Sequence, residues 1–500
     1  MKDLRHKVFW PTFLFLLLSV SSSILFKNAF LENVNSLNEF LLKYFGVLLN
    51  VVVGIMVITC LIIPFTELGK IKIGGAKAIP ILSRLKWFAI VLCTTIATGI
   101  LFWGTVEPLA HFNDPPNIEN LVAQSENAIY FSLSNMFLHW SFTPYAIYAI
   151  PALMFAIAYY NKEESFSLSS TLFPLFNLKQ RVKLGLIIDN VSLFALVMGM
   201  SASLGAGILT LRGGIERFVD IPFSSEVFTF LVALVIIISF IASASTGLLK
   251  GIKNLSFLNL LIFVFILLFV IATGFTEAYS YFIPSLKAYI AKMTYDAGFF
   301  LKDMNWANQW TTFYWANWMA WAPITALFLG RLAYGRTVRE FLLVNWVLPS
   351  IFAIIWMTVF GGNILFIEFN GIIDLTALVE AKGPQSVVYS FFNILPFAPF
   401  IIGLFIFTIY ISYVTAADSN TEAMGGISSL GITPESPSPS VPIKVLWGVI
   451  IGTTAITAIN FAGIKGIKML SNLGGIPAMF LMIFILLALY KFMFSIRRKK

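Results

Sequence analysis

The sequence carries little charge for its length. Only 11% of its 500 residues are Asp, Glu, Lys or Arg, whereas 58% are hydrophobic. A soluble chain of this size would form about three domains, each with charge on roughly a quarter of its residues. The composition therefore excludes a set of soluble domains and indicates a membrane protein.

Cysteine and histidine are also scarce. Cys60 and Cys93, the two cysteines, both fall within apolar runs, which excludes a disulfide framework or a cysteine-based metal cluster. The three histidines, His6, His111 and His139, are widely separated along the chain. We therefore expect no histidine metal site, no enzyme active site and no resident cofactor.

Long apolar blocks dominate the chain instead. Each is close to the 17–25 residues that cross a hydrocarbon core as a helix, so the sequence predicts an all-α membrane protein of about twelve spans. The first block lacks a small-residue cleavage site, and we interpret it as a retained helix rather than a signal peptide. The predicted spans are Phe9–Phe26, Tyr44–Phe65, Trp87–Gly104, Ala128–Ala158, Gly185–Leu211, Val227–Ala244, Phe257–Phe275, Trp310–Gly330, Phe341–Phe360, Leu395–Val414, Val445–Phe461 and Leu473–Phe494.

The net charge of +9 follows membrane topology. An even number of spans places both termini on one side, and most of the 33 Lys and Arg residues fall in the segments on that side. The loop 105–127 on the opposite side contains none. This asymmetry is typical of a multi-pass protein of the cell inner membrane with both termini in the cytoplasm, and it gives no indication of nucleic-acid binding.

Several predicted spans carry small or polar residues at depth, as transporter helices do. The third span has Thr94, Thr95, Thr98 and Gly99, and the fifth has a face of Gly and Ser that favours close helix packing. Packing is also an alternative explanation for the third span. The tenth span ends in 413-YVTAADSN-420; on its own, this pattern favours a solvated helix end over an ion site or a gate.

Aromatic residues cluster in the middle of two spans. Trp315, Trp318 and Trp321 are spaced three apart, and Trp140, Tyr145 and Tyr148 repeat the pattern in the fourth span. Interfacial belts place Trp and Tyr at span ends, so mid-span rings need another explanation. One hypothesis is a cage of π-faces for a cation that cannot donate hydrogen bonds; the alternative is aromatic core packing.

Taken together, these patterns resemble one transporter family, the betaine/carnitine/choline transporters. The likeness runs from the third to the tenth span. The segments that show the likeness are 99-GILFWGTVEPLAHF-112, 139-HWSFTPYAIYAIPAL-153, 199-GMSASLGAGILTLRGGI-215, 243-SASTGLLKGIKNLSFLN-259, 310-WTTFYWANWMAWAPITALFLGRLAYGRTVREF-341 and 415-TAADSN-420.

The resemblance implies a LeuT-like core of two inverted five-helix repeats preceded by two helices. The corresponding boundaries are 1–86 for the two N-terminal helices, 87–276 and 310–494 for the repeats, 277–309 for an external connector and 495–500 for a basic tail. It also implies a homotrimer in the lipid bilayer. The substrate box would comprise Trp140, Tyr145, Tyr148 and Trp318, with Trp315, Trp321 and Phe313 along the pathway and an unwound backbone at Thr95–Gly99 beside the substrate.

Two departures from the family pattern concern the substrate and the coupling ion. Thr95, Ala97 and Gly99 stand where the family has three glycines, and Asn317, where Trp is common, adds a group for a substrate carboxylate or hydroxyl. Of the hydroxyls expected to ligate sodium, Thr415 and Ser412 remain. Sodium symport, proton symport and substrate exchange therefore stay open.

The resemblance thus implies a secondary active transporter of a small cationic or zwitterionic quaternary-ammonium solute, such as glycine betaine, choline or carnitine. A carrier of the same fold for a sulfonium compound or an amino acid is the nearest alternative. A channel would need a repeated filter, and a transporter-like sensor would need a signalling domain; neither pattern is found.

Overall fold

The computed structural model describes residues 3–96, 99–118, 121–245, 251–294, 303–432 and 439–498, and these residues are predominantly helical. Ten helical stretches of the described residues are long and apolar enough to cross a membrane, and the bent pair α3–α4 makes an eleventh. Two of the ten, Val441–Ile459 and Gly463–Ile496, belong to α18 and are separated by a kink at Gly463. The aromatic-rich α12 (Phe313–Leu332) corresponds to the remaining predicted span. The expected all-α membrane fold is confirmed.

The helices follow the predicted order of spans. The first half contains α1 (His6–Leu25), α2 (Lys27–Ile62), α3 (Arg84–Ile96), α4 (Gly99–Asn113), α5 (Glu126–Trp140), α6 (Phe142–Ala156), α7 (Leu178–Ile215), α8 (Ser225–Ser245) and α9 (Gly251–Thr273). The second half contains α10 (Phe282–Thr294), α11 (Met304–Ala307), α12, α13 (Val338–Leu342), α14 (Leu348–Phe369), α15 (Leu375–Lys382), α16 (Ser386–Asn393), α17 (Ala398–Ile427) and α18 (Val441–Arg498).

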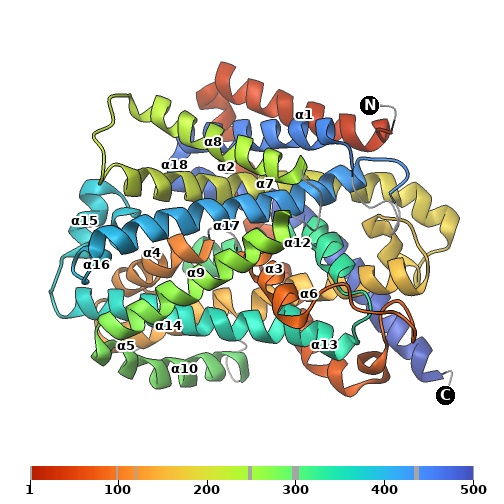
Figure 1. Ribbon diagram of the computed structural model, residues 1–500, viewed down its shortest axis with the longest axis horizontal. Coiled ribbons are helices and arrows are strands. Elements are labelled where there is room, and N and C mark those ends of the chain that lie inside the picture. The colour runs from red at the N-terminus through yellow and green to blue at the C-terminus, as the bar shows by residue number, and fades with distance from the viewer. Residues whose placement is uncertain are drawn as a thin grey trace.

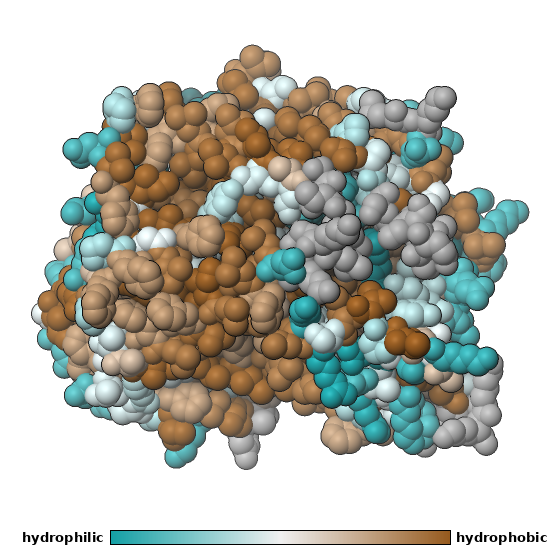
Figure 2. Space-filling view, in the orientation of Figure 1, coloured by the Kyte–Doolittle hydropathy of each residue, from teal (hydrophilic) through white to brown (hydrophobic). Residues whose placement is uncertain are grey.

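The long helices run roughly along one direction, and the two chain ends marked in Figure 1 lie at the same end of the molecule. Hydrophobic residues cover the broad middle of the face shown in Figure 2, and hydrophilic residues gather toward its two ends. This distribution is that of a protein whose sides contact hydrocarbon and whose ends contact water.

The end that holds the termini is tied together by basic loops. Backbone bridges join Leu4 to Ser429 and Lys72 to Thr337. Arg84 forms an ion pair with Glu340 at 2.6 Å. The loop after α2 thus packs on the start of α13, on the side that the charge pattern assigns to the cytoplasm.

Two of the spans are interrupted, and a third begins with a π-helical turn. α3 and α4 meet at an angle of 53° across residues 97 and 98, so Ala97 and Thr98 of the expected unwound stretch lie outside the described residues. α5 ends at Trp140 and α6 restarts at Phe142, because Ser141 adopts a non-helical conformation. A π-helical turn (Asn308–Thr312) precedes α12, a feature common at functional sites.

Some sequence expectations were wrong at span boundaries. The tenth span does not end near Val414: α17 continues to Ile427, and Thr415, Asp418 and Ser419 are buried within it. The interpretation of these residues as a solvated helix end is therefore wrong. α2 begins at Lys27 rather than Tyr44, because its first turns are polar but still favour a helix.

The small residues of α7 do serve packing, as predicted. A Cβ added to Gly199 would lie 2.8 Å from Cδ1 of Trp321 on α12, and one added to Gly205 would lie 3.1 Å from Ile467 on α18. The two glycines therefore let α7 approach both neighbours closely. The domain boundaries inferred from the resemblance stay a prediction.

Candidate functional site

The rings of Trp140, Tyr145 and Tyr148 surround the ring of Trp318, and the four come from three helices. Its ring centroid lies 5.5 Å from that of Trp140, 5.9 Å from Tyr145 and 5.2 Å from Tyr148. The Trp140 and Tyr148 contacts are edge-to-face, the arrangement that aromatic quadrupoles prefer. All four side chains are almost completely buried, so the predicted box exists as a ring cluster, and it is closed in this conformation.

The local sequence explains why these rings converge. Trp140 is the last residue of α5, and Tyr145 and Tyr148 are one turn apart on the following α6, so they share a face. Pro144 lies in the first turn of α6, where its missing N–H costs nothing. The break at Ser141 thus aims Trp140 and both tyrosines toward α12.

The third span reaches the cluster through Gly99 and Thr95. A Cβ on Gly99 would lie 2.7 Å from Cη2 of Trp140, so only glycine allows α4 to start against this ring. The Thr95 hydroxyl donates to the Val91 carbonyl at 2.8 Å and lies beside the hydroxyl of Tyr145. Both residues therefore border the cluster. Thr95 lies within α3 and Gly99 begins α4, so the expected unwinding does not extend to these two residues, and their contact with the substrate stays a prediction.

The other predicted pathway rings point elsewhere. Residues three apart on a helix lie about 60° apart around its axis, so Trp315 and Trp321 flank Trp318 on opposite sides and are about 120° from each other. Trp315 lies edge-on to His139 at 5.7 Å, and Trp321 packs against Gly199 of α7. Phe313 lies 5.8 Å from Trp103. The structure does not bring these three rings into the cluster.

Asn317 and the candidate sodium ligands are engaged within the protein. The Asn317 Oδ1 accepts from Ser471 of α18 at 2.9 Å, which turns it away from the rings. Thr415 donates to the carbonyls of Ile411 and Ser412, at 2.9 and 3.1 Å. Ser412 Oγ accepts from Asn259 at 3.0 Å. In this conformation the two α17 hydroxyls are therefore bonded to their own helix and to its neighbour α9.

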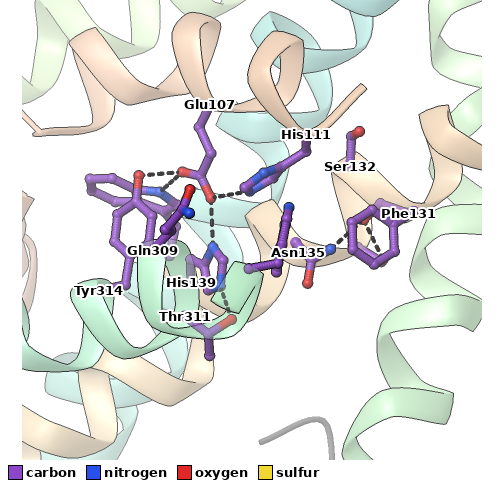
Figure 3. Close-up of polar contacts among 12 residues, drawn as sticks. Glu107, His111, Phe131, Ser132, Asn135, His139, Gln309, Thr311 and Tyr314 are labelled. Carbon is purple, nitrogen blue, oxygen red and sulfur yellow. Dashed lines mark hydrogen bonds and ion pairs between the residues drawn. The ribbon is translucent and has the colours of Figure 1, made fainter. Parts of the chain in front are cut away.

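A buried carboxylate directly adjoins the ring cluster. Glu107 of α4 accepts from the indole N–H of Trp140 at 2.8 Å and from the hydroxyl of Tyr314 at 2.5 Å, both on Oε2. Its Oε1 lies 2.6 Å from Nδ1 of His139 and 3.1 Å from Nε2 of His111. Figure 3 shows His111, His139 and Tyr314 converging on Glu107.

The hydrogen-bond pattern assigns the protons of the two imidazoles. His111 donates from Nε2 to Glu107, and its buried Nδ1 has no partner among the described residues. A neutral ring suits that environment, because a protonated Nδ1 would leave a buried donor unsatisfied. His139 donates from Nδ1 to Glu107, and its Nε2 lies 3.0 Å from the hydroxyl of Thr311.

Their separation along the chain suggested that the histidines are too scattered for a metal site, but the structure brings His111 and His139 together at Glu107. Ligand atoms of Glu107, His111 and His139 all lie within 4.8 Å of one another, and these residue types could hold a divalent metal. Ligand atoms around a tetrahedral zinc are about 3.3 Å apart, however. The 2.6 Å between Glu107 and His139 is instead the length of a charge-assisted hydrogen bond, so a metal would have to displace it.

The sequence contains local signals for this network, although it was not predicted. Glu107 and His111 are four apart on one helix, which places them on the same face. His139 directly precedes Trp140, a residue already assigned to the box. Tyr314 lies in the aromatic run of the eighth span but was not predicted as a site residue.

Comparisons with known proteins agree with this architecture. The sequence model of one protein family, described as BCCT, betaine/carnitine/choline family transporter, matches residues 7–497. The glycine betaine transporter OpuD of Bacillus subtilis (strain 168) is 29% identical over 479 residues, which cover 94% of this chain and 91% of that protein.

Two further relatives cover most of the chain. The ectoine/hydroxyectoine transporter of Virgibacillus pantothenticus is 29% identical and spans 95% of this chain and 93% of its own length. The betaine/ectoine transporter LcoP of Corynebacterium glutamicum is 31% identical over 463 residues, with coverages of 89% and 71%. The chain therefore belongs to the betaine/carnitine/choline transporter family.

Proposed function

We propose that the chain carries a quaternary-ammonium solute, such as glycine betaine, choline or carnitine, across the membrane by alternating access. The observation that carries this proposal is the convergence of Trp140, Tyr145 and Tyr148 on the ring of Trp318. The relatives named as a glycine betaine transporter and a betaine/ectoine transporter support the same substrate class.

The rings suit a methylated cation on physical grounds. Each π-face attracts a cation by about 0.5–2 kcal/mol, more when water is excluded. A trimethylammonium group has no N–H to satisfy, so it gives up little hydration when aromatic faces surround it. In the closed conformation three of the rings contact the ring of Trp318, and binding requires the four to separate around the substrate.

We further propose that an ion gradient drives the transport. Thr415 and Ser412 remain the candidate sodium ligands, and in that role they would have to turn away from Ile411 and Asn259. For a proton-driven cycle the candidate is Asp418, a buried carboxylate on the same helix that accepts from Ser243 at 2.5 Å. Substrate exchange without an ion is the third mode.

The position in the cell and the assembly complete the proposal. We place the protein in the cell inner membrane with both termini in the cytoplasm, supported by the shared end of the termini and the basic loops there. A homotrimer is expected from the family. Light scattering of the purified protein, corrected for bound detergent, measures the number of copies.

The test of the substrate is uptake of labelled glycine betaine and choline into proteoliposomes. Trp318→Leu is expected to abolish saturable uptake. Trp356→Leu is the matched control, because Trp356 is an equally buried indole that stacks on Phe360 outside the cluster. Wild-type uptake by the Trp318 variant at equal membrane content would overturn the proposal.

The same vesicles identify the driving ion and the solute. Sodium and pH gradients are imposed separately, and a counterflow assay without either gradient detects exchange. Competition by ectoine, a sulfonium analogue and unmethylated amino acids tests the neighbouring substrate classes. If ectoine competes more strongly than glycine betaine, the quaternary-ammonium assignment is wrong and ectoine becomes the assigned solute.

A further inference from the structure

Both oxygens of Glu107 are fully occupied by groups of the protein. Oε1 is shared by His111 and His139, and Oε2 is shared by Trp140 and Tyr314. The donors come from α4, α5 and α12, so three separate elements close around one carboxylate. Its side chain is completely buried.

Four donors match the whole capacity of a carboxylate. An ionised carboxyl group accepts through two oxygens with about four lone-pair sites. With all four sites used, Glu107 retains its charge beside the ring cluster but has no acceptor position left for another N–H or O–H group. This arrangement differs from the open carboxylate that proteins use to bind primary amines.

Glu107 acts on the substrate through Trp140. Its hydrogen bond fixes the edge of the indole, and a carboxylate at that edge makes the ring face more attractive to a cation. An ammonium that still carries an N–H must give up a hydrogen bond to water on entering the cluster, and the occupied oxygens of Glu107 offer none in exchange. A fully methylated ammonium has no such bond to lose.

From this geometry we propose that Glu107 is the positioning residue that makes the site selective for fully methylated ammonium, and that Tyr314 protects this selectivity by occupying its fourth acceptor position. The inference rests on the proposed function, since it concerns the same ring cluster. It adds a reason for the discrimination: a charge that is present but shielded from N–H donors.

The experiment compares glycine betaine with N,N-dimethylglycine, whose protonated amine keeps one N–H. Tyr314→Phe keeps the ring and removes the hydroxyl, which frees one lone pair of Glu107 Oε2. The KM ratio of dimethylglycine to glycine betaine is expected to fall about tenfold in this variant, the value of one hydrogen bond to a charged group. The KM for glycine betaine is expected to change much less.

Tyr413→Phe is the matched control, because it removes another buried hydroxyl, which donates to the Met200 carbonyl outside the cluster. Its KM ratio is expected to equal that of the wild type. Glu107→Gln replaces two acceptor positions by N–H donors that face other donors. This variant should weaken the binding of both substrates and shift the fluorescence of Trp140.

The outcomes separate the two proposals. A wild-type protein that does not take up glycine betaine overturns the proposed function. A wild-type protein that prefers glycine betaine, combined with an unchanged ratio in Tyr314→Phe, overturns the role of the shielded carboxylate alone. A fall of the ratio in both tyrosine variants would also count against it, because the effect would not be specific to Glu107.

Discussion

The first residue of α4 touches the Trp140 ring so closely that no side chain fits between them. Trp140 Cη2 lies only 2.7 Å from the position of a Cβ on Gly99, and its Cζ3 lies at 3.1 Å. Contacts this short force a shift, and both neighbours are confined: Gly99 by the helix break and Trp140 by its bond to Glu107.

Gly99→Ala is therefore expected to displace the indole and raise the KM for the transported solute at least tenfold. The matched control is Gly403→Ala on α17, where no atom of the described chain lies within 4 Å of the added Cβ. That variant should transport normally and gain about 0.5–1 kcal/mol from the better helix former. Equal KM values for the two variants would argue that Gly99 does not hold Trp140 in place.

A second prediction concerns the buried ion pair between Lys444 of α18 and Glu422 of α17, whose side chains are 3% and 1% exposed. Lys444→Met leaves a buried charge without its partner and is expected to lower the free energy of unfolding by about 3–5 kcal/mol. Thermal unfolding in detergent measures the loss.

The double variant Lys444→Met, Glu422→Leu removes both charges and is expected to regain most of that stability, because an apolar pair of similar volume replaces the ion pair. If the double variant is less stable than the single one, the pair does not act as a unit.

A third prediction concerns the N-terminal segment, which links the ends of two helices. Arg5 forms an ion pair with Asp189 of α7 at 2.8 Å and donates to the Ile427 carbonyl at the end of α17 at 2.7 Å. Leu4 bridges to Ser429. The segment therefore ties α7 and α17 together at the end that we place in the cytoplasm.

If α17 moves during the cycle, fixing this contact must stop transport. Cysteines at Leu4 and Ser429, in a background with Cys60 and Cys93 replaced, are expected to lose uptake on oxidation and recover it on reduction. Arg5→Ala should instead ease the opening and raise the turnover rate. Full uptake by the oxidised protein would mean that this contact persists through the whole cycle.

A pH effect is expected outside the spans, at Asp303. The backbone N–H groups of Trp306 and Asn117, at 3.0 and 3.2 Å, lower the pKa of its carboxyl group. Because the pKa is lowered in the folded protein, the ionised carboxylate stabilises the start of α11 at pH values above the ordinary aspartate pKa of about 3.9. This stabilisation is lost as the pH falls through the native pKa.

Hydrogen exchange at the Trp306 amide should therefore accelerate as the pH falls below that range, relative to its intrinsic rate. Asp303→Asn keeps a capping oxygen but cannot titrate, so its protection should be weaker at neutral pH and independent of pH in the acid range. The same acid-induced loss in the Asn variant would assign the effect to another group.

The spans could be predicted from local patterns in the sequence, whereas the members of the four-ring cluster were identified through the family resemblance. Runs of apolar residues define the spans, and the spacing of Trp140, Tyr145 and Tyr148 fixes their directions once the helix is broken at Ser141. The helical repeat places Trp315 and Trp321 about 60° to either side of Trp318, but their contacts with His139 and Gly199 depend on which neighbouring helices face them. The expectation that both line the pathway stays a prediction.

The carboxylate network was missed because it depends on tertiary contacts. Glu107 and His139 are 32 residues apart, and Glu107 and Tyr314 are separated by 207. The i,i+4 spacing of Glu107 and His111 pairs only those two residues, and nothing in the sequence places His139 and Tyr314 against the same carboxylate. The length of α17 was missed for a related reason: hydropathy registers a polar stretch as an end, although Thr415 and Asp418 are buried by neighbouring helices.

Two joints in the spans adjoin the ring cluster: the 53° bend between α3 and α4, next to Gly99, and the non-helical Ser141, next to Trp140. Backbone rotation at these joints can re-aim the aromatic faces while the intact helical segments on either side keep their own hydrogen bonds. The hydrocarbon-facing surface would then stay sealed as the interior opens to one compartment or the other. The solute would thus reach the rings through movement at the interior joints, while the lipid-facing helical segments keep their structure.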